Sequence, residues 1–201
     1  MTKRISHKTR QQGFTLIETM IAIAIMSIGI LTLLATFAVA VGSTEFSEDN
    51  LIARQKALQA LESVYTARNT QQIAFSQIAN TSSGGIFTTG ATQLLCAGPD
   101  GLVNTTDDVA CPASGPCAAG PECVVLPGKD GILGTADDVG LSLANFTRQI
   151  SITNALNADG TTNTTLKIVV VTITYSTSGG TAGSSAAAHT YTVSALVSSD
   201  H

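Results

Sequence analysis

The sequence predicts an α+β fold in which a long N-terminal helix packs against a small antiparallel sheet. Residues 19–44 form an uncharged, mostly apolar run, and residues 43–79 contain no glycine or proline. The last quarter of the chain holds three segments rich in β-branched residues, and a helix followed by grouped strands is the order of an α+β domain. The expected divisions are a leader 1–13, a membrane helix 14–42, an amphipathic helix 43–80, a loop region 81–145 and a sheet 146–201.

The apolar run is long enough to cross a bilayer as a helix, which takes about 20 residues. A basic leader with Lys3, Arg4, Lys8 and Arg10 precedes it and would stay in the cytoplasm. The run is too long for a secretory signal and lacks an A-x-A cleavage site. A plain signal anchor leaves Glu18 unexplained, because an unpaired carboxylate at the edge of a membrane segment costs on the order of a few kcal/mol.

The remainder of the chain has the weakly charged composition of an exported protein. Charged residues make up 12% of the sequence, and only six basic residues against fourteen acidic ones remain without the leader, a net charge near −8. Such a chain has no basic patch for nucleic acid. Aromatic residues are few and tryptophan is absent, which also argues against a base-stacking surface.

One short motif before the apolar run is specific, and it reads Gly13-Phe14-Thr15-Leu16-Ile17-Glu18. It resembles the processing motif of type IV pilins and type II secretion pseudopilins. The resemblance implies that a prepilin peptidase cuts between Gly13 and Phe14 and that Phe14 is then N-methylated. Glu18 would be the fifth residue of the mature chain, where it can pair with the new ammonium in its own or a neighbouring subunit, because a buried charge needs a partner. The alternative is that Glu18 lies in the headgroup zone.

The continuation through residues 22–31 resembles minor pilins of the pilus-modification class and I-type minor pseudopilins. The resemblance implies a minor pilin that initiates assembly or modifies the pilus tip or shaft. Such a subunit waits in the bacterial inner membrane with its C-terminal domain in the periplasm and then joins the extracellular pilus. Its implied partners are other pilins, through the N-terminal helix, and the inner-membrane assembly platform. A type II secretion pseudopilin and a major filament subunit or adhesin are the alternatives.

Beyond the membrane segment the helix is expected to continue to near Asn69, giving a helix on the order of 80 Å long from about Phe14. Its apolar face is predicted from a stripe of large apolar residues spaced by seven, three and four positions, namely Leu51, Leu58, Leu61 and Tyr65. Ile52, Ala57 and Val64 flank that stripe. The sheet is expected to cover this face.

The loop region contains four cysteines, Cys96, Cys111, Cys117 and Cys123. An even number in one loop-rich stretch of an exported chain favours disulfides. Zinc is the alternative, but the paired C-x2-C knuckles of zinc sites are missing. Four cysteines allow three pairings, and we expect neighbours to pair, Cys96 with Cys111 and Cys117 with Cys123.

The same region holds an internal repeat. Residues 98–109 recur as residues 128–139, with seven of twelve positions identical. Each copy brings three carboxylates into one short loop, and an all-oxygen set suits calcium. Two solvated Asx turns of shared origin are the alternative. The expected calcium ligands are Asp100, Asp107, Asp108, Asp130, Asp137 and Asp138.

Three strands are predicted at residues 146–153, 166–175 and 189–197, with turns at residues 157–160 and around Gly179 and Gly180. Short links between them predict an antiparallel meander, and the order of these strands also resembles pilus-modification pilins. Arg148 and His189 are interpreted as strand residues rather than as a site. No Ser/His/Asp or Cys/His set can be assembled, so an enzyme is not expected, and no organic cofactor is expected either.

Overall fold

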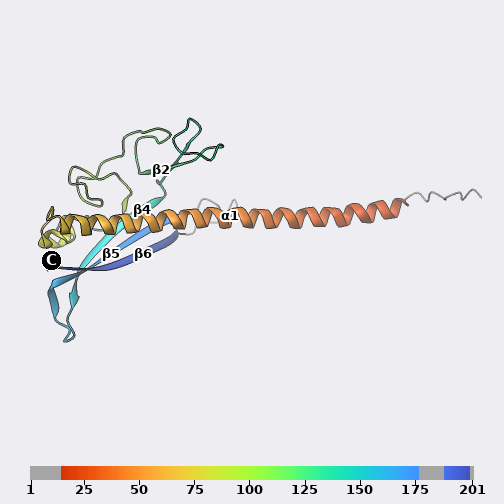
Figure 1. Ribbon diagram of the computed structural model, residues 1–201. Coiled ribbons are helices and arrows are strands. Elements are labelled where there is room, and N and C mark those ends of the chain that lie inside the picture. The colour runs from red at the N-terminus through yellow and green to blue at the C-terminus, as the bar shows by residue number, and fades with distance from the viewer. Residues whose placement is uncertain (1–14, 177–187, 200–201) are drawn as a thin grey trace, which may run out of the picture. The chain divides into compact units, whose positions relative to one another are not determined.

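The computed structural model describes residues 15–176 and 188–199, and the chain divides into a unit up to Thr44 and a unit from Glu45 onward. One helix, α1 (Leu16–Asn69), is followed by two short 3₁₀ turns, η1 (Phe75–Gln77) and η2 (Thr81–Ser83) (Figure 1). The strands are β1 (Thr92–Gln93), β2 (Cys123–Leu126), β3 (Val139–Ser142), β4 (Phe146–Leu156), β5 (Thr162–Ser176) and β6 (Ala188–Ser198). The predicted α+β class is confirmed.

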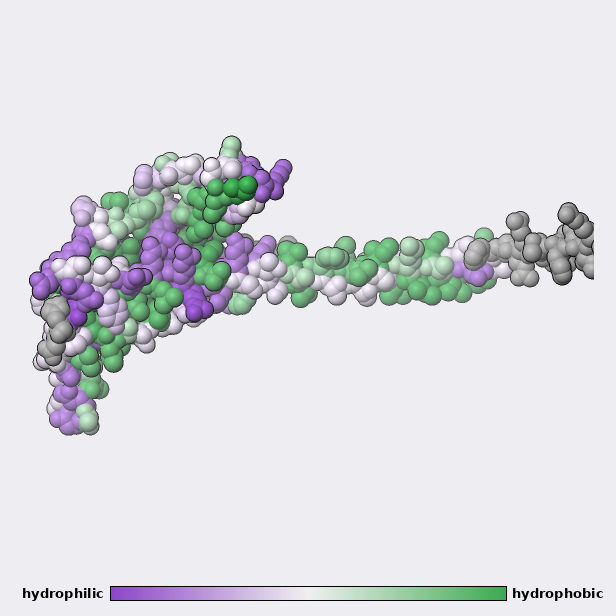
Figure 2. Space-filling model, viewed as in Figure 1, coloured by the Kyte–Doolittle hydropathy of each residue, from purple (hydrophilic) through white to green (hydrophobic). Residues whose placement is uncertain are grey.

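The part of α1 up to Thr44 is covered with exposed apolar side chains (Figure 2). Within the described residues, α1 is the one helix long and apolar enough to cross a membrane, judged by length and composition. Hydroxyl side chains of this part bond within the helix: those of Ser27, Thr32 and Thr36 donate to carbonyls three or four residues earlier. These hydroxyls therefore add little cost to placing the segment in lipid.

The main sheet has the strand order β1-β4-β5-β6, with every neighbouring pair antiparallel. The predicted meander is thus confirmed for β4, β5 and β6, which are longer than the sequence indicated. The two-residue edge strand β1 was not predicted. The turn between β4 and β5 lies where expected, closed by the Asn157 N–H donating to the Thr161 carbonyl, with Gly160 at positive φ. The turn predicted around Gly179 and Gly180 lies outside the described residues.

The predicted apolar face of α1 is wrong in its orientation. Leu51 and Leu58 are exposed, and Leu61 and Tyr65 are half-buried at the margin. Four of the six buried positions are alanines, and they share one hydrophobic core with the bulky β-branched side chains of β4 and β5. Leucines at those positions would hold the helix away from the sheet. The buried face consists of Ile52, Ala53, Ala57, Ala60, Val64 and Ala67.

The helix ends at Asn69, as its periodicity suggested, so the amphipathic division drawn to residue 80 is wrong over its last eleven positions. Gln71 takes a left-handed conformation with φ 59°, and the Gln72 N–H donates back to the Ala67 carbonyl at 2.9 Å. This arrangement closes the helix without a glycine and turns the chain away from the helix axis.

Two buried polar side chains fasten the segment after the helix to the sheet. The Asn80 side chain donates to the Ile150 carbonyl at 2.7 Å and accepts from the Ile152 N–H at 2.9 Å, so it pairs with β4 as a strand would. The Lys167 ammonium donates to the carbonyls of Phe75 and Ile78 at 2.9 and 2.7 Å. Burial lowers the pKa of Lys167.

Candidate functional site

The predicted cleavage site at Gly13 and Phe14 lies outside the described residues. Glu18 lies in the first turn of α1, where a carboxylate interacts favourably with the positive end of the helix dipole. Its backbone N–H donates to the Thr15 carbonyl at 3.1 Å, and its side chain is exposed. Among the described residues, Glu18 has no ion-pair partner. The carboxylate is therefore available to a partner from outside that part of the chain.

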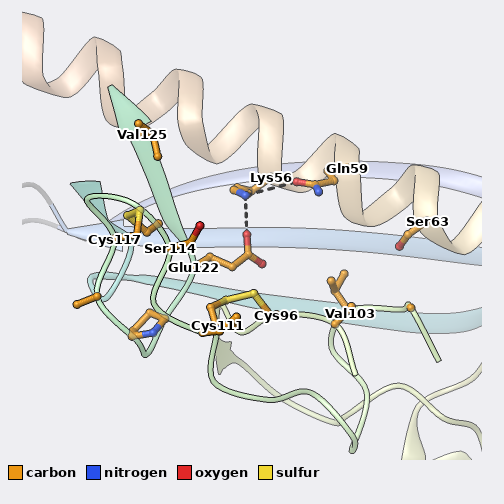
Figure 3. A pocket seen from close by; sticks show the side chains of 16 residues that line it. Lys56, Gln59, Ser63, Cys96, Val103, Cys111, Ser114, Cys117, Glu122 and Val125 are labelled. Atoms are coloured by element: carbon orange, nitrogen blue, oxygen red, sulfur yellow. Dashed lines mark hydrogen bonds and ion pairs between the residues drawn. A yellow bond between two sulfur atoms is a disulfide. The ribbon is translucent and has the colours of Figure 1, made fainter. Parts of the chain in front are cut away.

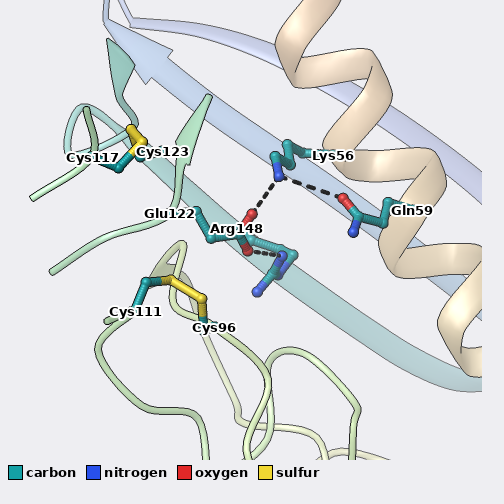
Figure 4. The surroundings of a disulfide bond; sticks show 8 residues. All are labelled: Lys56, Gln59, Cys96, Cys111, Cys117, Glu122, Cys123 and Arg148. Atoms are coloured by element: carbon teal, nitrogen blue, oxygen red, sulfur yellow. Dashed lines mark hydrogen bonds and ion pairs between the residues drawn. A yellow bond between two sulfur atoms is a disulfide. The ribbon is translucent and has the colours of Figure 1, made fainter. Parts of the chain in front are cut away.

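The loop region is cross-linked as predicted. Disulfides join Cys96 to Cys111 and Cys117 to Cys123, which confirms neighbour pairing and makes zinc coordination by these cysteines wrong (Figure 4). All four sulfur atoms are used, and the loops they close are short, with sequence separations of 15 and 6 residues. The disulfides stabilise a stretch whose own buried apolar side chains are few.

An ion-pair network that the sequence analysis missed ties these loops to the rest of the domain. Glu122 accepts from the Lys56 ammonium of α1 at 2.5 Å and from Nη1 of Arg148 on β4 at 3.3 Å (Figure 4). Burial lowers the pKa of Arg148, and the nearby carboxylates of Glu122 and Asp108 act in the opposite direction. Glu122 thus joins helix, sheet and disulfide loops, and Arg148 is confirmed as a paired strand residue. In the sequence, the one available sign of this network was that Glu122 is an isolated acidic residue beside Cys123 in a nearly uncharged stretch.

A cavity of about 500 Å³ lies between α1 and the two disulfide loops. Figure 3 shows Lys56, Gln59 and Ser63 of the helix on one side and the cysteines on the other. The Lys56–Glu122 ion pair lies in its wall, and prolines and alanines supply much of the remainder. The cavity holds no second titratable pair, so its residues form no recognisable catalytic set.

The N-terminal segment matches a known family. The family model of the prokaryotic N-terminal methylation motif matches residues 8–34, which include the Gly13–Glu18 string and the first part of α1. The chain has a type IV pilin-like N-terminus. The match covers the first part of the chain alone. No curated protein and no solved structure matches the chain.

The pilin-like motif implies processing by a prepilin peptidase and assembly with other pilins, and it is consistent with anchoring of the chain in a membrane. It also favours a structural subunit over an enzyme. The repeated loops lie outside the matched region.

The two copies of the repeat in this pilin-like chain fold through the same hydrogen bonds. In the first copy, the Asp100 N–H donates to Oδ2 of Asp107 at 3.2 Å and the Asn104 N–H to Oδ2 of Asp108 at 2.7 Å. The Thr105 hydroxyl donates to Oδ1 of Asp107 at 2.6 Å. In the second copy, the matching bonds to Asp137 and Asp138 measure 3.2, 2.7 and 2.7 Å. In each copy, the aspartate carboxylates therefore hold the loop closed by accepting hydrogen bonds from its own N–H and hydroxyl groups.

The first glycine of each copy has a steric role. A Cβ at Gly98 would overlap the carbonyl and carboxylate of Asp107, and a Cβ at Gly128 would overlap the same groups of Asp137. The Asp-Gly turn that follows needs positive φ, which Gly101 and Gly131 provide at 68° and 70°. These requirements explain several of the identical positions without a ligand.

The expected calcium ligands are therefore brought together within each copy, but mainly as acceptors for the loop's own donors. Within the described residues, no three His, Cys, Asp or Glu side chains are arranged to hold a metal ion. The Thr105 and Thr135 hydroxyls lower the pKa of Asp107 and Asp137, whereas burial raises the pKa of Asp108. The donor set is still all oxygen, which is the chemistry calcium takes. Calcium binding stays a prediction.

Proposed function

We propose that the chain is a structural subunit of a type IV pilus or a related filament. The observation that carries this proposal is the methylation motif at residues 8–34, which overlaps an apolar helix with one carboxylate, Glu18, near its start. After cleavage the new ammonium of Phe14 needs a partner in an apolar filament core, and Glu18 can supply it. That pair favours one axial register between neighbouring helices, as a single polar residue does in a coiled coil.

Within that function we propose a minor pilin that initiates assembly or modifies the tip or shaft. The residue pattern over positions 22–31 supports this choice. The disulfide-bonded loops, which include the separate β2–β3 hairpin, supply a distinctive surface for such a role. A type II secretion pseudopilin, or a major subunit or adhesin, is the alternative, and the same N-terminal motif serves all of these.

The deciding experiment is quantitative mass spectrometry of filaments sheared from the native cells. The minor-pilin proposal expects a peptide that begins at N-methylated Phe14, at trace stoichiometry beside a dominant pilin. Dominance of that peptide identifies a major subunit. A mature chain that stays in the membrane and is absent from surface filaments identifies a pseudopilin. An uncleaved chain overturns the proposal.

A variant separates the role of Glu18 in assembly from a role in processing. We expect Glu18→Ala to leave cleavage after Gly13 largely intact and to block incorporation, because the ammonium of Phe14 then has no partner. The mature mass reports cleavage, and the sheared fraction reports incorporation. Glu45→Ala, also on α1 but outside the apolar run, is the matched control and should assemble normally. Normal incorporation of Glu18→Ala would rule out the ammonium pairing.

We propose calcium as a ligand of the repeated loops, on the chemistry of their oxygen donors. Saturating ligand stabilises a protein by RT ln(1 + [L]/Kd). The detergent-solubilised full chain should therefore melt at a higher temperature in millimolar calcium than in chelator, and replacing both Asp137 and Asp138 by Asn should reduce the shift. A rise below ~1 °C would leave the loops as hydrogen-bonded turns.

A further inference from the structure

The tip of the second repeat presents two large apolar side chains to solvent. Ile132 and Leu133 are 61% and 62% exposed. Their backbone is held on both sides, because the Ile132 N–H donates to Asp130 and the Gly134 N–H donates to Asp138. The loop extends beyond β2 in Figure 1, and Figure 2 shows apolar and strongly polar residues side by side at its end. A rigid, exposed apolar pair of this kind is suited to docking.

The first repeat shows what this loop does when it is docked. Leu102, the counterpart of Ile132, is 2% exposed and belongs to the hydrophobic core. Val103, the counterpart of Leu133, lines the cavity beside Gln59 and Ser63 of α1 (Figure 3). In the first repeat, the apolar pair at the tip of the loop is thus packed beside α1 of the same chain.

The same helix carries a second apolar surface that the chain itself does not cover. Leu51 and Leu58 are 65% and 43% exposed, lie two turns apart, and face away from the alanine face that meets the sheet. Arg54, Gln55 and Glu62 flank them in a shallow groove along the helix. We call this surface the leucine groove.

We propose that the Ile132–Leu133 tip of one copy docks in the leucine groove of a second copy of this chain. Charge supports this partner: the tip is preceded by Lys129 and Asp130, and the groove is bordered by Glu62 and Arg54, so each side offers one charge of each sign to the other. Tip and groove are different surfaces, and such a heterologous contact repeats in one direction to build an open helical assembly.

This inference rests on the proposed filament function and specifies one of its contacts. It requires two copies to be neighbours, which a minor pilin satisfies in a tip cluster of several copies and a major subunit would satisfy throughout the filament. It therefore also bears on abundance, because single copies scattered among other pilins make no such contact.

Site-specific photocrosslinking tests the contact in the full-length chain in cells. A photoreactive residue replaces Leu133, and a second copy with a different epitope tag is coexpressed. We expect crosslinks between the two tags that map to residues 51–62 of the partner copy. The matched control places the photoreactive residue at Leu156, which is 70% exposed on β4, and should give no crosslink to that segment.

Two variants sharpen the result. Leu58→Glu in the second copy should lower the crosslink yield at least about tenfold, because it places an unpaired charge against the apolar tip, whereas Leu196→Glu on β6 should leave it unchanged. Reversing Lys129 or Glu62 alone should lower the yield about 2–5-fold, and reversing both should restore it.

Membranes and sheared filaments are analysed separately so that the two proposals can fail independently. A chain that enters filaments without crosslinking to residues 51–62, or that crosslinks to another protein instead, overturns the docking and leaves the filament function standing. A crosslink in membranes, with the chain absent from all filaments, supports the docking and overturns the filament function.

Discussion

The two repeats share one loop and differ in what surrounds it. Each starts from an equivalent antiparallel pair, Cys96 with Val109 in the first copy and Leu126 with Val139 in the second. In the first copy a disulfide reinforces this base and the tip is buried in the core. In the second copy the base extends into the β2–β3 hairpin and the tip is exposed.

The comparison distinguishes the interactions that form the loop from the packing of the loop within the domain. The carboxylate–amide bonds and the Asp-Gly turn are the same in both settings, so the loop shape is set locally. Position 104 shows the adaptation: Asn104 is buried, and its side chain donates to the Thr88 carbonyl at 3.2 Å, whereas its counterpart is the exposed Gly134. The first copy is a structural element and the second is a presented surface.

The largest expected effect separates the two apolar tips. Leu102→Ala should lower the free energy of unfolding by about 2–5 kcal/mol, because it opens a cavity in the core. Ile132→Ala should change it by no more than about 0.5 kcal/mol, because that side chain is largely in solvent. Denaturant unfolding of the full chain in detergent measures both. Equal losses would mean that the second tip is packed in the folded chain.

A smaller effect is expected from removing the disulfides. Replacing Cys96 and Cys111 by Ser frees the base of the first repeat and should cost about 3 kcal/mol, from the entropy of the closed loop. Replacing Cys117 and Cys123 opens a shorter loop and should cost about 2 kcal/mol. Thermal unfolding compares the two pairs. The reverse order would show that the hairpin of the second repeat depends on its disulfide more than the first repeat does.

The smallest effect is a difference in acid response. Asp107 and Asp137 have lowered pKa values, so their contribution is present above the unfolded value of about 3.9 and is lost as pH falls through the lower folded value. Asp108 has a raised pKa because of burial, so it protonates above about 3.9, and stability increases as pH falls through that interval. Within the first repeat, the two neighbouring carboxylates Asp107 and Asp108 therefore change stability with pH in opposite directions.

NMR titration of backbone amides measures this response. The Asp100 and Asp130 amides, which donate to Asp107 and Asp137, should shift with midpoints below about 3.9. The Asn104 amide, which donates to Asp108, should shift above that value. A common midpoint for all three amides would contradict the opposite pKa shifts of Asp107 and Asp108.

Local patterns in the sequence were sufficient for much of the fold. Alternation predicted β4, β5 and β6, and the thirty-residue offset revealed the repeat. The expectation that neighbouring cysteines pair was correct, although the spacing alone left three pairings open. The helix face could not be found in this way, because α1 carries two apolar stripes. Hydropathy ranks Leu51 and Leu58 above Ala53 and Ala60, whereas close packing on a sheet of large side chains favours the alanines.

Residues that act across long sequence distances were beyond the reach of pattern analysis. Asn80 recognises β4 from 70 residues away, and Glu122 joins residues of a helix and a strand far from it in sequence. Neither residue belongs to a motif, and each is an ordinary polar residue until its partners are known. The motif at Gly13, Phe14 and Glu18, in contrast, could be recognised because its residues are consecutive or nearly so.

The paired ends of the second repeat make it a place to insert foreign sequence. Strand β2 ends at Leu126, which pairs with Val139 at the start of β3. The number of residues between this pair can therefore change without altering the packing of helix and sheet. A peptide grafted in place of residues 127–138 would be carried on a closed β-ribbon rather than on a loose terminus. Each copy of the chain would then present one ordered graft in place of the Ile132–Leu133 tip, at the cost of the contact proposed for that tip.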